Sequence, residues 1–207
     1  GQITRVSTNS SGGQSNGGSF EPVFSPDGKF LVFTSYAGNL AAADTNASRD
    51  IFLKNLETGG VTLLSAKASG VSGNNSSFKP VFSADGAQLL FTSYASDLVA
   101  NDSNAVADAF VRNMLTGEIV RLNQLMGRAQ FDQATLAEAF SADGKSLLLT
   151  SYATNLLPGD VNGCADVVLV NLLGVNEGGF DTVMAGFSVT LPDAIEKLVL
   201  TGTGFIN

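Results

Sequence analysis

Short hydrophobic runs alternate with polar, glycine-rich stretches along this chain, and their order recurs with a period of 58 residues. Each period contains a turn of the form Phe-Ser-Pro/Ala-Asp-Gly, at 24–28, 82–86 and 140–144. Each also contains the sequence Thr-Ser-Tyr-Ala, at 34–37, 92–95 and 150–153. A fixed period of this kind indicates structural units that follow one another in tandem.

The hydrophobic pattern predicts four β-strands in each unit. The first strand ends at the Asp-Gly pair, which favours a tight hairpin because glycine accepts a positive φ. The second strand is apolar at nearly every position, so we expect both of its faces to be buried. The third is a short apolar run, and the fourth follows a turn that contains glycine. The predicted second strands are 30–35, 88–93 and 146–151, the third 51–53, 109–111 and 167–169, and the fourth 61–65 and 119–123.

Four-stranded sheets in tandem, with the middle strands buried between neighbours, are typical of β-propeller blades. The sequence Phe-Ser-Pro-Asp-Gly-Lys, a strand ending in Phe-Thr-Ser, then Asp-Ile-Phe and a Thr-Gly turn resemble the TolB-type propeller repeat. The resemblance covers about residues 3–174, although the period is longer than is usual in that family. It implies an all-β fold, a propeller-like array of four-stranded antiparallel blades. We place the three units at about 3–60, 61–118 and 119–174.

Three blades are too few to close a ring, because propellers typically have about four to eight. The segment 3–7 aligns with the predicted fourth strands, so the chain begins in the middle of a unit. We therefore expect either a native chain with further blades or self-association through blade faces. Two chains that exchange strands in this way would form a ring of about six blades.

The repeat ends near residue 174, and the segment 175–207 follows a different pattern. Its runs Ser-Val-Thr-Leu-Pro, Ile-Glu-Lys-Leu and Leu-Thr-Gly resemble the lead-in to the Ca²⁺-binding β-rolls of RTX proteins. This resemblance implies type I secretion and an extracellular, bacterial-type location. An ordinary closing β-hairpin is the alternative for this segment.

Charge and composition argue against several functions. The net charge is −8 and only 11 Lys and Arg residues occur, which argues against nucleic acid as a partner. No apolar run reaches the roughly 18 residues that a membrane span requires. The chain has no histidine and a single cysteine, Cys164, so it lacks Ser-His-Asp and Cys-His catalysis and any intrachain disulfide. These features favour a non-enzymatic role.

An acidic motif, Asp-x-Asn-x-x-x-Asp, precedes the third strand of every unit. Ca²⁺ prefers several oxygen ligands, and alternate residues of a tight loop can direct side-chain oxygens inward together. The motif therefore predicts a calcium site in each loop, completed by backbone carbonyls or water. The alternative is that these side chains only bond to the backbone of their own turn. The candidate ligands are Asp44, Asn46, Asp50, Asp102, Asn104, Asp108, Asp160, Asn162 and Asp166.

Two further observations bear on these loops. Only the first loop contains a basic residue, Arg49, so we expect nothing else in the chain to neutralise the three carboxylate pairs. The three tyrosines, Tyr36, Tyr94 and Tyr152, occupy equivalent positions and could stack on sugar rings, although we expect them to pack beside each blade.

Two functional classes remain open. The first is a secreted, non-catalytic, calcium-binding module for extracellular binding, adhesion or assembly, with a glycan or a cell-surface protein as its partner. The alternative is a fragment of a secreted polysaccharide-degrading or other hydrolytic enzyme whose catalytic residues lie elsewhere.

Overall fold

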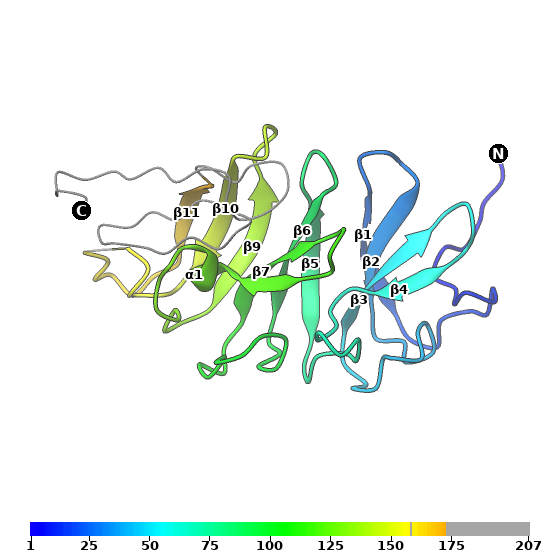
Figure 1. The fold of residues 1–207 in the computed structure, drawn as a ribbon, viewed down its shortest axis with the longest axis horizontal. Coiled ribbons are helices and arrows are strands. Elements are labelled where there is room, and N and C mark those ends of the chain that lie inside the picture. The colour runs from blue at the N-terminus through cyan, green and yellow to red at the C-terminus, as the bar shows by residue number, and fades with distance from the viewer. Residues whose placement is uncertain (158, 173–207) are drawn as a thin grey trace, which may run out of the picture.

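The structure, a computed structural model, describes residues 1–157 and 159–172. These residues form three antiparallel sheets, here called blades 1, 2 and 3, which follow one another along the chain (Figure 1). Blade 1 contains β1 (Ser19–Phe24), β2 (Phe30–Ser35), β3 (Asp50–Asn55) and β4 (Val61–Leu63). Blade 2 contains β5 (Ser77–Phe82), β6 (Gln88–Ser93), β7 (Asp108–Asn113) and β8 (Ile119–Arg121). The described part of blade 3 contains β9 (Thr135–Phe140), β10 (Ser146–Ser151) and β11 (Asp166–Asn171).

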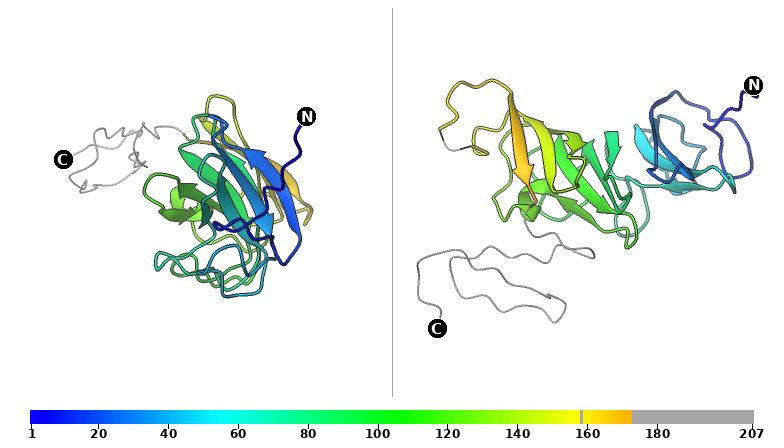
Figure 2. Two further views of the ribbon diagram at one scale, coloured as in Figure 1. Left: turned by 90° about the vertical axis from the view of Figure 1, so that its right-hand side faces the viewer. Right: turned by 90° about the horizontal axis from the view of Figure 1, so that it is seen from above.

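Strands that are consecutive in the sequence are neighbours in each sheet. The two further views show the blades arranged one beside the next, in the order of the chain (Figure 2). This arrangement confirms the predicted all-β array of propeller-like blades, with four antiparallel strands in blades 1 and 2. The predicted second strands are confirmed to the residue in all three blades.

The second and third strands carry the core, and in blades 1 and 2 they are buried on both faces. One face of blade 1, with Val32 and Ile51, packs against Leu89, Phe91 and other residues of blade 2. The opposite face of blade 2 packs in the same way against blade 3. The middle strands of blade 2 therefore contribute alternate side chains to two interfaces, which explains their continuous apolar sequence.

The first strands contain a bulge that the hydrophobic pattern did not predict. The register of β1 against β2 shifts between Phe20 and Val23, and β5 shifts at the equivalent place. Glu21 and Lys79 lie in these bulges with φ of 52° and 53°, in the left-handed region. An extra residue in a bulge redirects its side chain, here toward the neighbouring blade.

The fourth strands are shorter than predicted. β8 ends at Arg121, and Leu122 begins the short helix α1 (Leu122–Leu125) instead of extending the strand. Leu122 is fully buried in the interface between blades 2 and 3. The chain therefore turns inward at this point, because burying the Leu122 side chain is more favourable than extending β8 by one residue.

In the described residues, no helix is long and apolar enough to cross a membrane. The segment 175–207, with its predicted resemblance to an RTX lead-in, lies outside the described residues.

Candidate functional site

The three acidic loops occupy the same place in each blade, between the second and third strands. Their second aspartates, Asp50, Asp108 and Asp166, are the first residues of β3, β7 and β11. Each loop is held by its asparagine, whose side-chain oxygen accepts a hydrogen bond from the backbone N–H two residues later. These bonds measure 2.7 Å for Asn46 to Ser48, 3.2 Å for Asn104 to Val106 and 2.7 Å for Asn162 to Cys164.

The asparagines also tie two of the loops to the segment that leads into the next blade. The side-chain amide of Asn46 donates to the carbonyl of Gly73 at 2.6 Å, and that of Asn104 donates to the carbonyl of Phe131 at 3.0 Å. Both polar ends of these two side chains are thus used to shape the loop. Any metal held by these loops would depend mainly on the aspartates.

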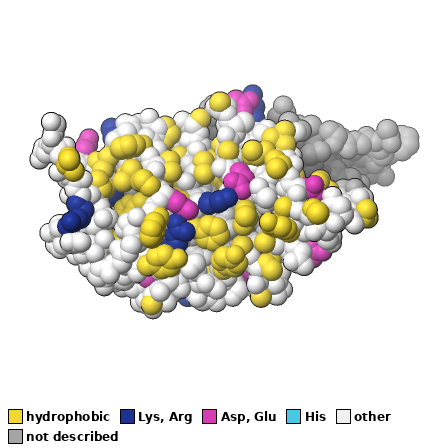
Figure 3. All heavy atoms as spheres, turned by 180° about the vertical axis from the view of Figure 1, so that it is seen from behind, with side chains coloured by type: hydrophobic (Ala, Val, Ile, Leu, Met, Phe, Trp, Pro, Cys, Tyr) yellow, Lys and Arg dark blue, Asp and Glu magenta, His cyan; other side chains and the backbone are white. Residues whose placement is uncertain are grey.

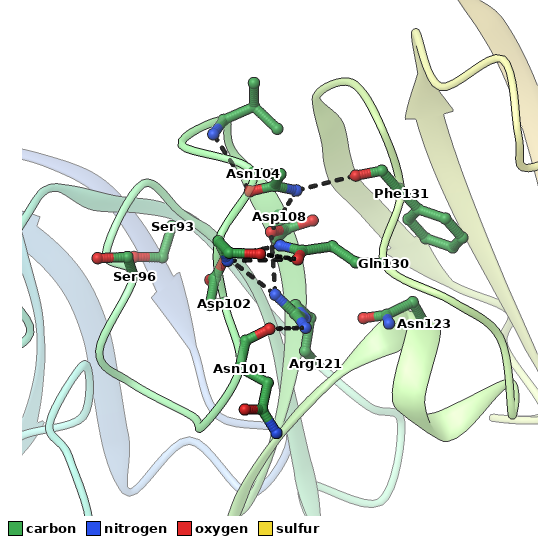
Figure 4. A network of polar contacts seen from close by, with 12 residues as sticks. Ser93, Ser96, Asn101, Asp102, Asn104, Asp108, Arg121, Asn123, Gln130 and Phe131 are labelled. Carbon is green, nitrogen blue, oxygen red and sulfur yellow. Dashed lines mark hydrogen bonds and ion pairs between the residues drawn. The ribbon is translucent and has the colours of Figure 1, made fainter.

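In blade 2 the acidic loop surrounds a buried arginine (Figure 4). Arg121 Nη1 lies 2.9 Å from Asp102 Oδ1 and 3.7 Å from Asp108 Oδ2, and Nη2 donates to the carbonyl of Asn101 at 2.9 Å. The side chains of Arg121 and Asp102 are only 3% and 4% exposed. Gln130 donates a further hydrogen bond to Asp102 at 2.8 Å. The cluster therefore carries its own cation.

Burial and the neighbouring charges have opposing effects on the pKa of Asp108. Burial raises the pKa of Asp108 to about 6; the hydrogen bond from Asn104 opposes this shift, Asp102 adds to it, and Arg121 opposes it. The guanidinium occupies the space beside both carboxylates.

Arg121 is the site residue that the sequence analysis missed. The expectation that no basic residue outside the first loop neutralises a carboxylate pair was wrong, because Arg121 reaches the second loop from β8. One signal was available: the repeat places Arg121 at the position of Leu63, so that a charge interrupts an otherwise apolar strand.

In blade 1 the equivalent pair is buried without such a partner. Asp50 is fully buried and Asp44 is 8% exposed. The Ser65 hydroxyl donates to Asp50 Oδ1 at 2.5 Å, but in the described residues neither oxygen of Asp44, nor Asp50 Oδ2, has a hydrogen-bond partner. Burial raises the pKa of Asp44 and, with the nearby charge of Asp44, raises the pKa of Asp50 to about 7.

Arg49 does not neutralise this pair, although it lies in the same loop. Its guanidinium turns to the other side, where Nη2 is 2.9 Å from Glu21 Oε2 and donates to the Thr34 hydroxyl at 2.7 Å. The loop of blade 3 is more open, since Asn162 is exposed and Asp160 and Asp166 are partly exposed. Across the described residues, no group of three or more His, Cys, Asp and Glu side chains is placed to hold a metal ion.

A second feature is the surface formed by the first strands, here called the first-strand face: Phe20, Tyr36, Phe78, Tyr94 and Tyr152 with Arg49. Tyr36 packs edge-on against Phe20, with ring centroids 6.2 Å apart, and Tyr94 packs against Phe78 at 5.8 Å. The Arg49 guanidinium lies between the blades, 5.5 Å from the centroid of Phe20 and 5.9 Å from that of Phe78.

Tyr36 and Tyr94 pack against neighbouring rings, and all three tyrosines remain accessible. Tyr36, Tyr94 and Tyr152 are 52%, 46% and 48% exposed. Polar contacts join the blades on the same side. Glu21, which pairs with Arg49 within blade 1, accepts the backbone N–H of Lys79 in blade 2, and Lys79 pairs with Glu138 of blade 3 at 2.9 Å. One side of the molecule shows acidic and basic side chains meeting in a row among hydrophobic ones (Figure 3).

Comparison with known proteins places this chain beside propeller structures. No family model and no curated protein matches it. TolB from Acinetobacter baumannii is 21% identical with a TM-score of 0.46, over 84% of this chain and 34% of that one. A putative TolB from Agrobacterium tumefaciens is 16% identical with a TM-score of 0.49, over 74% and 42%. An oligogalacturonate lyase in complex with manganese is 21% identical with a TM-score of 0.44, over 82% and 38%. The chain thus spans well under half the length of these proteins.

Proposed function

We propose that this chain is a secreted, non-catalytic binding module that holds its ligand against the first-strand face. The observation that supports this role most directly is the set of half-exposed aromatic rings that recurs from blade to blade. The ring pairs of blades 1 and 2 are joined by the guanidinium of Arg49, which lies against Phe20 and Phe78. Rings held in this way present a flat apolar surface at a low cost in side-chain entropy.

A glycan is the ligand class that suits this surface best. Tyrosine combines a flat apolar ring with a polar hydroxyl, and a sugar ring offers apolar C–H groups beside hydroxyls. The charges of Glu21, Arg49, Lys79 and Glu138 are joined in ion pairs, so this face has little net charge of its own. Because the whole chain has a net charge of −8, a polyanionic glycan would be repelled. We therefore expect a neutral glycan.

The same ion pairs support a binding role over a catalytic one. General acid–base catalysis requires carboxyls or bases that are available to exchange protons with the substrate. Here Glu21 is held by Arg49, and Glu138 by Lys79. Histidine, the commonest general base, is missing from the whole sequence. The resemblance of the segment 175–207 to RTX lead-ins is what supports the proposed secreted location.

A glycan array probed with the full chain tests this function, followed by calorimetry on any neutral glycan that binds. Tyr94→Ala should weaken binding by roughly tenfold or more, since a ring that anchors a ligand contributes about 2 kcal/mol or more. Leu115→Ala is the matched control, because Leu115 is 94% exposed at a turn outside this face.

Two results would contradict the proposal. If the array detects no bound glycan, a glycan is not the ligand of this face. Cleavage of a bound polysaccharide with turnover by the purified chain would favour the alternative role in a hydrolytic enzyme.

A further inference from the structure

Asp44 and Asp50 are two carboxyls enclosed by blade 1 without a counter-charge. Three of their four oxygens have no hydrogen-bond partner in the described residues, namely both oxygens of Asp44 and Oδ2 of Asp50. The exception, Asp50 Oδ1, accepts the Ser65 hydroxyl. Burial of ionised carboxyls without partners is strongly unfavourable, because the charges lose their hydration. A pair of this kind therefore requires either a proton or a bound cation.

The basic side chains nearest in the sequence are all engaged elsewhere. Arg49 pairs with Glu21, and Lys67 pairs with Asp97 at 2.9 Å. Lys54 donates to the backbone carbonyls of Thr8 and Gly59, at 3.0 and 2.6 Å. Among the ion pairs of the described residues, none includes Asp44 or Asp50.

Blade 2 shows what occupies this position when the chain supplies its own cation. Arg121 is paired with Phe110 across β7 and β8, and Leu63 is paired with Phe52 in the same way across β3 and β4. The two residues thus occupy the same point of the repeated sheet. In blade 2 the guanidinium lies beside Asp102 and Asp108, whereas Leu63 offers no charge to Asp44 and Asp50.

We propose that Asp44 and Asp50 bind one Ca²⁺ ion, at the place that the Arg121 guanidinium occupies in blade 2. Two carboxylates match the charge of a divalent cation, and hard oxygen donors are the ligands that Ca²⁺ prefers. The oxygen of Asn46 already accepts the Ser48 N–H, so backbone carbonyls and water complete the shell. This assignment limits the calcium predicted for all three loops to the first loop.

A groove lies next to the loop in the sequence. An open groove of about 1000 Å³ is lined by residues 41–43, immediately before Asp44, and by Leu63. Its wall on the other side includes Lys67 and Arg112.

The first measurement is calcium titration of the full chain after treatment with EDTA, by calorimetry and by elemental analysis. We expect one bound Ca²⁺ per chain and a melting temperature that rises with millimolar Ca²⁺ and falls with EDTA, because a ligand bound only by the native state stabilises it. No bound calcium, or a melting temperature indifferent to both, would overturn the proposal and leave a proton between the two carboxyls.

Exchange of the two residues provides a sharper test. Leu63→Arg places the guanidinium of blade 2 in blade 1 and should reduce bound calcium from one ion per chain to none. Arg121→Leu recreates the blade 1 site in blade 2 and should raise bound calcium to two. If either variant fails to fold, Asp44→Asn, which keeps the side-chain volume, should weaken calcium binding by about tenfold or more, since affinity follows the number of charged ligands.

The control is Asp160→Asn in the third loop, which should leave the stoichiometry and affinity unchanged. Calcium that remains bound with unchanged affinity in Asp44→Asn would show adventitious surface binding and would overturn the proposal. Loss of calcium in Asp160→Asn but not in Asp44→Asn would overturn it equally, because the site would then lie in the third loop.

Discussion

Asp108 shows at the scale of one residue how burial and neighbouring charge oppose each other. The carboxyl is 1% exposed, and burial raises its pKa to about 6 although Asn104 donates to it and Arg121 lies 3.7 Å away. Arg121 therefore compensates only part of the free energy that burial of the ionised Asp108 carboxylate requires. The uncompensated part makes the stability of the fold depend on pH.

The pH dependence of stability has a definite sign. Because the pKa of Asp108 is higher in the folded state than the ordinary value of 3.8, protonation favours the folded state. Its contribution is fully present below about pH 4 and is lost as the pH rises through about 6. Denaturant unfolding in EDTA between pH 4 and 7 should show a smaller dependence on pH for Asp108→Asn than for the wild type. Identical pH profiles for the two proteins would show that the pKa of Asp108 is the same in the folded and unfolded states.

At the scale of an element, the segment before β1 is positioned by a close approach to the loop after β2. A Cβ added at Gly17 would lie 2.6 Å from the backbone carbon of Tyr36 and 2.7 Å from the backbone nitrogen of Ala37. The Tyr36 N–H also donates to the carbonyl of Gly18 at 3.0 Å. This backbone contact thus helps to fix the loop that carries Tyr36, together with the Ser35 hydroxyl, which donates to the carbonyl of Gly18 at 3.0 Å.

Gly17→Ala should therefore destabilise the fold by about 1–3 kcal/mol, the cost of overpacking against rigid backbone. The matched control is Gly38→Ala, since a Cβ at Gly38 meets nothing within 4 Å. Urea unfolding of both variants measures the difference. Equal stability of the two variants would contradict the close approach.

Elements differed in how far the sequence could predict them. The strands β2, β6 and β10 matched the prediction because a run that is apolar on both faces has few alternative interpretations. The bulges at Glu21 and Lys79 were not predicted, since their cause is a partner on the next blade rather than a local pattern. The candidate site was likewise predictable only where a local sequence pattern determines it. The acidic loops were found from their spacing, but the burial of Asp44 and the arrival of Arg121 depend on contacts across the sheet.

At the scale of the whole molecule, the repeated interface between blades ends on an exposed apolar surface. Leu148, Val167 and Leu169 are 37%, 72% and 63% exposed on one side of β10 and β11. Their equivalents in blade 2, at positions 90, 109 and 111, are buried against blade 3. The exposed side of blade 3 therefore has the composition of a blade interface, which supports the prediction that blade faces associate.

The double substitution Val167→Lys and Leu169→Lys should weaken self-association by about tenfold or more, because charge is disfavoured in the core of an apolar interface. Thermal stability should fall little, since both side chains are exposed. Leu115→Lys, at an exposed turn, serves as the control and should leave association unchanged. Light scattering over a range of concentrations measures the effect. A wild-type chain that remains monomeric at every concentration would contradict the prediction.

The burial of the middle strands on both faces has a consequence for the order in which the molecule opens. In an array where each repeat contacts only its neighbours, stability is the sum of intrinsic and nearest-neighbour contributions. Within the described residues, blade 2 contributes to both blade–blade interfaces, whereas blades 1 and 3 each contribute to one. The backbone amides of β6 and β7 should thus be the last to exchange with solvent deuterium, and protection should decrease outward toward both neighbouring blades.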